Sequence, residues 1–160
     1  MNNKGNMALE VIGALLVIVI LGTFYFVSDK ATQDINDNIQ NSSINNESKA
    51  IFQNTADNYS SWSDYAMLSI FIIIWLMSLI SAWYTDESPI LVIVSILLFI
   101  FVIIGAIFVQ DAILGIIEDA EFSGQYATMP ITVFLINNMV MLLTAMGLSI
   151  GLLLYLRFTR

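Results

Sequence analysis

The sequence predicts an all-α integral membrane protein with four transmembrane helices, a short helical outer hairpin and an amphipathic outer loop helix. Apolar residues make up 58% of its 160 residues and charged residues 11%, whereas about a quarter of a typical soluble domain is charged. The charges gather in short stretches. The four apolar stretches between them each reach the roughly 20 residues that a helix needs to cross the hydrocarbon core of a bilayer.

The four predicted membrane segments are apolar on every side. This favours membrane-spanning helices over the strands of a β-barrel, in which apolar and polar residues alternate. They run from about Ala8 to Val27, from Tyr65 to Tyr84, from Pro89 to Val109 and from Ile131 to Phe158. Trp62 and Tyr65 precede the second segment, and Trp83 and Tyr84 close it. Trp and Tyr favour the headgroup level, so these residues mark the two edges of the membrane.

Basic residues predict the orientation. Lys4 precedes the first segment, and Arg157 and Arg160 end the last, so the positive-inside rule places both termini on the cytoplasmic or internal side. The chain then divides into five regions. Three contain membrane helices, namely 1–27 with the first, 65–110 with the second and third, and 131–160 with the fourth and a basic C-terminus. Between them lie two outer regions, the polar acidic segment 28–64 and the loop 111–130.

The outer segment 28–64 predicts a helical hairpin that stands on the membrane. Ile35 and Ile39 share one helix face, so the first helix is expected to continue to about residue 40. An Asn- and Ser-rich break follows, and a short second helix is expected from Glu47 to about Asn58. Three Asn-x-Ser sequons lie here, at Asn41, Asn46 and Asn58. They are either glycosylation sites or the chance product of an Asn- and Ser-rich stretch.

The loop from Asp111 to Phe122 predicts a short amphipathic helix at the membrane surface. Its apolar residues Ile113, Ile116, Ile117 and Ala120 step by three and four, which suits one helix face. The carboxylates around them match no calcium-loop spacing and are expected to form a solvated acidic face rather than a metal site.

Composition excludes several functional classes. The chain has no cysteine and no histidine, and its formal net charge is −8 with only five Lys and Arg. Thiol chemistry, the usual general base and the commonest zinc ligands are therefore absent, and a basic surface for nucleic acid is not expected. We predict no catalytic residue, no metal and no cofactor.

Polar and small residues in the fourth segment predict close helix packing. The amides of Asn137 and Asn138 lie well inside the segment, where they either join helices by hydrogen bonds or line a conduction path. Gly147 and Gly151 form a small-xxx-small pair that lets helices approach closely. The expected partners are the lipid bilayer and either copies of this chain or a larger membrane complex.

The N-terminus carries a short motif. Lys4 and Gly5 precede Asn6, Glu10 follows, and an apolar helix continues from there. This resembles the class III signal of type IV pilin-like proteins, especially the archaeal type. The resemblance implies cleavage after Gly5, a mature chain that begins at Asn6, and a Glu at the fifth mature position that helps to register neighbouring subunits. It covers residues 1–27 only, and three further membrane segments stand where a pilin has a globular head.

These observations favour a non-enzymatic, multi-pass membrane protein with a structural or assembly role, in a viral membrane or envelope or in a cellular membrane complex. One alternative is a pilin-like filament or secretion-system component processed at Gly5. Another is a small channel or holin-like pore that places Asn137 and Asn138 around a wet axis.

Overall fold

The computed structural model describes residues 7–84, 89–118 and 122–158, and helices account for nearly all of them. The helices are α1 Met7–Gln40, α2 Asn46–Tyr84, α3 Pro89–Ile117, α4 Ser123–Thr128, α5 Pro130–Asn137 and α6 Met139–Phe158. By length and composition, α1, α2, α3 and α6 can each cross a membrane. The chain is therefore an all-α membrane protein with four such helices, as the sequence predicts.

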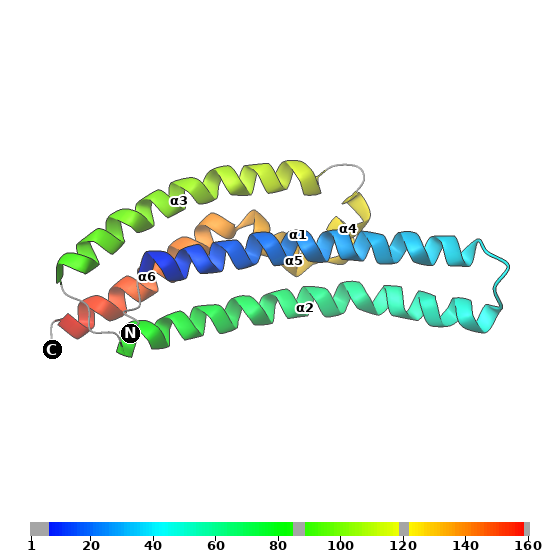
Figure 1. Cartoon of the computed structure of the whole chain (residues 1–160), viewed down its shortest axis with the longest axis horizontal. Coiled ribbons are helices and arrows are strands. Elements are labelled where there is room, and N and C mark those ends of the chain that lie inside the picture. The colour runs from blue at the N-terminus through cyan, green and yellow to red at the C-terminus, as the bar shows by residue number, and fades with distance from the viewer. Residues whose placement is uncertain (1–6, 85–88, 119–121, 159–160) are drawn as a thin grey trace.

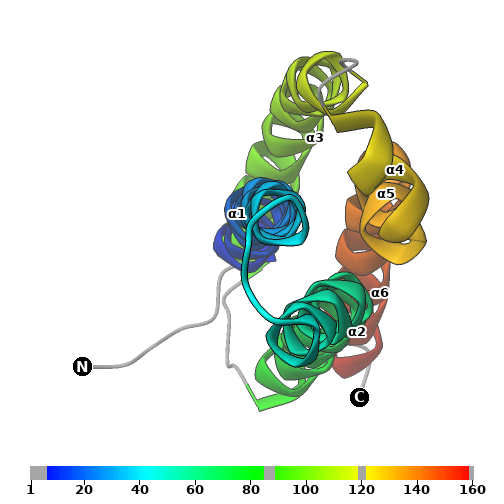
Figure 2. The same ribbon diagram turned by 90° about the vertical axis from the view of Figure 1, so that its right-hand side faces the viewer.

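Two long helices, α1 and α2, run antiparallel side by side along the whole molecule (Figure 1). Seen along the bundle, α3 packs on one side of α1, and α4, α5 and α6 occupy the remaining side (Figure 2). The start of α1 and the end of α6 lie at one end of the bundle, which we call the base (Figure 1). The turn between α1 and α2 projects beyond the other helices at the opposite end, which we call the hairpin end.

Each long helix buries one narrow stripe. On α1 the buried positions are spaced by three, four or seven residues, at Val11, Ala14, Ile18, Gly22, Phe26, Asp29 and Asn36. On α6 they are Met139, Leu143, Met146, Ile150 and Leu154. This spacing keeps one seam of each helix against its neighbours. The opposite faces expose large apolar side chains, such as Phe101 and Phe108 on α3, as expected for helices whose solvent is lipid.

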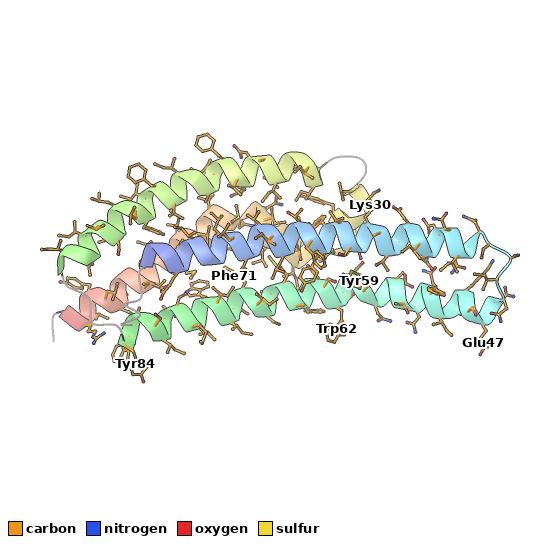
Figure 3. All side chains as sticks on the ribbon, in the orientation of Figure 1. Lys30, Glu47, Tyr59, Trp62, Phe71 and Tyr84 are labelled. Atoms are coloured by element: carbon orange, nitrogen blue, oxygen red, sulfur yellow. The ribbon has the colours of Figure 1, made fainter. Side chains whose placement is uncertain are left out.

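Aromatic side chains project from α2 away from the bundle. Trp62 and Tyr84 both point outward, one midway along α2 and one at the base (Figure 3), and they are 79% and 78% exposed. The two residues are 22 positions apart, or about 33 Å along a helix. That separation matches the roughly 30 Å of a hydrocarbon core, so the part of the hairpin beyond Trp62 stands clear of the lipid tails.

The hairpin turn is held by side chains that meet the free backbone groups of both helix ends. Asn45 Oδ1 accepts a hydrogen bond of 2.8 Å from Ser48 N–H and so caps α2. Lys49 Nζ donates to Gln40 O at 2.6 Å, and Gln40 Nε2 donates to Lys49 O at 2.9 Å. This reciprocal pair closes α1 against α2.

The second helix differs from its prediction. We expected a short outer helix to about Asn58 and a separate membrane segment from Tyr65, but α2 is one unbroken helix of 39 residues. It contains neither Gly nor Pro, so nothing in its backbone interrupts the hydrogen-bond ladder. The outer hairpin is therefore made from the ends of two membrane helices.

The outer loop also differs in detail. Residues 111–117, predicted as the start of a separate amphipathic helix, are the last turns of α3, and the separate short helix of this loop is α4. Ile113 and Ile117 are buried against the bundle, whereas Ile116 is 53% exposed. Ala120 lies outside the described residues. The buried side of the helix here is therefore narrow, because it includes Ile113 and Ile117, which are four residues apart, but not Ile116.

The fourth predicted segment is interrupted. Instead of one helix from Ile131 to Phe158, α5 ends at Asn137 and α6 begins at Met139. Asn138 between them has φ −109° and ψ 16°, outside the helical region. The amide side chain of Asn138 donates to Phe134 O at 2.9 Å, and this local bond competes with a regular helix at the break.

Close approach of α3 and α6 depends on Gly147. A Cβ at this position would lie only 2.2 Å from the Phe99 ring, and both residues are buried. Gly151, its predicted partner, is half-buried. Gly105 on α3 has no atom within 4 Å of such a Cβ.

We expect Gly147→Ala to destabilise the bundle by about 1–3 kcal/mol, because the added methyl group overlaps the Phe99 ring. Gly105→Ala is the matched control and should be neutral or slightly stabilising, since it gains helix propensity with no overlap. Thermal unfolding of both variants in the same detergent measures the difference. Equal melting temperatures would show that the Phe99 contact does not constrain the packing.

Candidate functional site

A buried polar junction lies midway along α2, where α1, α2 and α5 meet. Its main residue is Asp64 of α2, which is 3% exposed. Asp64 Oδ2 accepts from Ile131 N–H at 2.9 Å, and Asp64 Oδ1 accepts from Thr132 N–H at 2.5 Å. These are the N–H groups that an N-cap side chain normally satisfies. A carboxylate from another helix therefore caps α5.

The local sequence of α5 explains why it needs this cap. Its own N-cap residue is Met129, whose side chain makes no capping hydrogen bond, and Pro130 at the first position has no N–H. The next two N–H groups would be unpaired in a buried site without Asp64. The negative charge of the carboxylate is also favourable at the positive end of the α5 dipole.

A second carboxylate joins α1 to α2 nearby. Asp29 is fully buried, and its two oxygens accept hydrogen bonds from the Ser60 hydroxyl and, at 2.8 Å, from Gln33 Nε2. Ser60 lies one turn before Asp64 on α2, so the two carboxylates belong to one junction. The hydroxyl of Thr132 is also buried there and has no hydrogen-bond partner among the residues that the structure describes.

The break after α5 is bridged by Gln110 of α3. Gln110 Nε2 donates to Asn137 O at 2.6 Å, and Gln110 Oε1 accepts from Val140 N–H at 3.2 Å. One amide side chain thus pairs with a C=O before Asn138 and an N–H after it. Gln110, which the sequence analysis does not single out, therefore supplies two interhelical bonds at this break.

The two asparagine side chains differ, because Asn137 bonds to another helix and Asn138 bonds within its own turn. Asn137 Nδ2 donates to the Tyr126 hydroxyl of α4 at 3.2 Å, and Asn138 bonds within its own turn. Near the base, Trp75 Nε1 donates to Ser149 Oγ at 3.1 Å and joins α2 to α6. Each interhelical bond of this kind stabilises a membrane bundle by about 1 kcal/mol.

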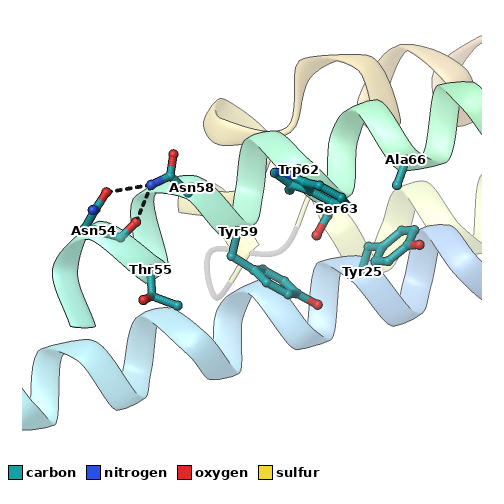
Figure 4. Close-up of a pocket in the computed structure, with 8 residues that line it drawn as sticks. All are labelled: Tyr25, Asn54, Thr55, Asn58, Tyr59, Trp62, Ser63 and Ala66. Atoms are coloured by element: carbon teal, nitrogen blue, oxygen red, sulfur yellow. Dashed lines mark hydrogen bonds between the residues drawn. The ribbon is translucent and has the colours of Figure 1, made fainter. Parts of the chain in front are cut away.

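Two grooves flank the α1–α2 pair at the hairpin end. The first, of about 510 Å³, opens on one side and is lined by Tyr25, Asn54, Thr55, Asn58, Tyr59, Trp62, Ser63 and Ala66 (Figure 4). The second, of about 430 Å³, lies on the other side and includes Gln33, Gln53, Asp57 and Thr128. Only the second is bordered by a residue from outside the α1–α2 pair, because Thr128 belongs to α4.

The remaining predicted sites are not brought together. Asn41, Asn46 and Asn58 are all exposed at the hairpin end, on the turn and on α2. Gly5 and Asn6 lie outside the described residues. Glu10 is half-buried near the base, where it borders a lipid-side groove between α1 and α2 with Gly13 and Val17.

In residues 7–84, 89–118 and 122–158, no three Asp or Glu side chains gather in a way that could hold a metal ion. The buried carboxylates accept hydrogen bonds from backbone and hydroxyl groups of neighbouring helices, which fixes helix positions. No protein-family model, curated protein or solved structure matches this chain.

We expect Asp64→Asn to lower the stability of the protein by about 1–3 kcal/mol, because an amide NH₂ would face an unpaired backbone N–H of α5. Asp57→Asn is the matched control, since Asp57 lies two turns away on the same helix, is exposed and bonds only to Gln53. Thermal unfolding in detergent reports the difference. An unchanged melting temperature for Asp64→Asn would contradict the role of Asp64 as a cap.

Gln110→Leu should loosen the junction between α5 and α6, because Asn137 C=O and Val140 N–H both lose their partner. The expected effect is faster hydrogen exchange at residues 137–142, with a loss of stability of about 1–3 kcal/mol. Asp111→Asn, one residue away and exposed, should leave the exchange unchanged. Identical exchange in both variants would show that Gln110 does not hold the break.

Proposed function

We propose that this chain is a non-enzymatic structural or assembly subunit of a membrane complex. It is inserted with both termini on the internal side and the hairpin end outside. Its setting is either a viral membrane or envelope or a small accessory position in a cellular membrane complex. In both settings its task is to hold a fixed shape in the bilayer and present the hairpin to other components.

The main observation in support of the proposal is that the buried polar side chains form hydrogen bonds with neighbouring helices. Asp29, Asp64 and Gln110 each bond to a neighbouring helix, and such bonds position helices. A transporter or a proton pathway instead needs ionisable groups that face a substrate or a water-filled path. The polar residues of this bundle therefore support a scaffold.

The hairpin supports an assembly role. It extends well beyond the other helices (Figure 1), and acidic residues outnumber basic ones in residues 28–64. Hydrogen bonds between Asn36 Nδ2 and Gln53 Oε1, at 2.9 Å, and between Gln40 and Lys49 hold its two helices together. A rigid, charged projection of this kind is suited to contacts with other molecules outside the membrane.

The bonds of Asn137 and Asn138 favour helix packing over the pore alternative. The Asn137 amide donates to the Tyr126 hydroxyl, and the Asn138 amide donates to Phe134 O. A pore lining would instead leave these amides to bond water along an axis between copies. Helix packing therefore remains our proposal for this pair.

Purification from native membranes in mild detergent tests the proposal. We expect particles heavier than one chain, in which this protein occurs at a fixed ratio to itself or to other subunits. Monodisperse single chains with nothing bound would contradict an assembly role. The intact mass of the chain in the same sample tests the pilin-like alternative: a chain beginning at Asn6 supports processing after Gly5, and a retained Met1 contradicts it.

A further inference from the structure

One side of the hairpin carries a continuous uncharged surface, which we call the seam. Its α1 positions are Tyr25, Ser28, Thr32, Ile35 and Ile39. Its α2 positions are Phe52, Thr55, Tyr59, Trp62 and Ala66. Within each helix these residues follow one another at steps of three and four, which is the repeat by which a helix meets another along its length.

The two helices present the seam on the same side. The groove of Figure 4 lies between Tyr25 of α1 and Thr55, Tyr59, Trp62 and Ala66 of α2. The other seam residues lie at steps of three and four from these, so they extend the same surface toward the turn. The seam therefore spans about 21 Å along α1 at 1.5 Å per residue.

The opposite side of the hairpin is covered by its own chain. Lys30 Nζ lies 5.7 Å from the centre of the Phe122 ring. A Cβ on Gly124 of α4 would lie 3.6 Å from Gln33 Oε1. Seen along the bundle, α4 and α5 stand on that side of the pair (Figure 2). Among the described helices none lies over the seam, where Ile35, Phe52 and Trp62 are 55%, 43% and 79% exposed.

Charge distinguishes the seam from the rest of the hairpin. The charged residues of this stretch fall between the seam positions, at Asp29, Lys30, Asp34, Asp37, Asp57 and Asp64. Two acidic chains repel each other wherever such residues face across a contact. The seam is a surface on which two copies can meet without that repulsion.

The threonine hydroxyls of the seam are already satisfied inside each helix. Thr32 Oγ1 donates to Ser28 O at 2.8 Å, and Thr55 Oγ1 donates to Ile51 O at 2.9 Å. A helix that covered these threonines would therefore bury methyl groups without leaving an unpaired hydroxyl. Ile35 and Phe52, near the turn, would be removed from water at the same time.

We propose that the seam is the contact between two copies of this chain, which pair hairpin to hairpin. Copies inserted in the same direction are related by a two-fold axis along the membrane normal, so each seam meets the other at the same height. The two α1–α2 pairs then form a four-helix bundle that extends outward from the membrane edge, with side chains of one copy filling the groove of the other. The inference rests on the assembly role proposed above and names the partner as a second copy.

Cysteine cross-linking tests the pairing, because the chain has no cysteine of its own. Full-length Ile35→Cys and Phe52→Cys place single thiols on the seam, and Asp34→Cys and Asp57→Cys place them on the same helices away from it. In native membranes treated with a short bis-maleimide, we expect covalent dimers from the two seam variants at a rate severalfold above that of the controls. Equal rates, or faster reaction of the controls, overturn the proposal.

A charged variant gives an independent measurement. Ile35→Asp adds a carboxylate at an exposed position, so the monomer should keep its melting temperature while two seams repel. We expect dimer dissociation in nanodiscs to become easier by about tenfold or more, the effect of roughly 1.4 kcal/mol. Asp34→Asn serves as the control and should leave the dimer intact or tighter. An unchanged monomer–dimer ratio for Ile35→Asp overturns the proposal.

The outcomes separate this inference from the proposed function. If the seam cysteines cross-link only to a different polypeptide, pairing of copies is wrong and the assembly role stands. If mass spectrometry finds lipid bound to a purified single chain and no dimer, pairing is also wrong. If the seam cysteines remain unlinked and nothing co-purifies from native membranes, both proposals fail.

Discussion

The packing of this bundle depends on the short helix α5, because both ends of α5 lie against other helices and need hydrogen-bond partners there. A helix leaves N–H groups at its start and C=O groups at its end without internal partners, and lipid supplies no replacement. The carboxylate of Asp64 on α2 accepts from an N–H group at the start of α5, and the amide of Gln110 on α3 donates to a C=O group at its end. The positions of α2, α3, α5 and α6 are thus fixed relative to one another by two side chains.

The polar residues of the junction follow the same stripes as the apolar core. Asp64 is flanked on its helix by the buried Ser60, Met67 and Phe71, and Gln110 lies one turn from the buried Ala106 and Ile113. Both side chains bond from this inward stripe to a neighbouring helix, as buried polar groups generally require a hydrogen-bond partner. The core and the junction are therefore one packing surface.

The sequence alone predicted the membrane helices well because length and hydropathy depend on little else. It also predicted that α1 continues to about residue 40, since Ile35 and Ile39 keep the helical spacing. The break at Asn138 was not predicted, because no Gly or Pro marks it and the bond from Gln110 is visible only when α3 and the fourth segment lie side by side. Asp64 lies in the stretch 28–64 that the sequence predicts as a polar acidic outer segment, although its spacing to Ser60, Met67 and Phe71 is a signal for the inward stripe.

The continuous backbone hydrogen bonding of α1 and α2 makes these two helices stiff along their whole length. At 34 and 39 residues, these helices are about 51 Å and 58 Å long, and no kink divides either of them. A sideways load on the turn is therefore carried as a lever through the bilayer to the base. Mechanical input at the tip would thus be felt on the far side of the membrane before the tip itself bends.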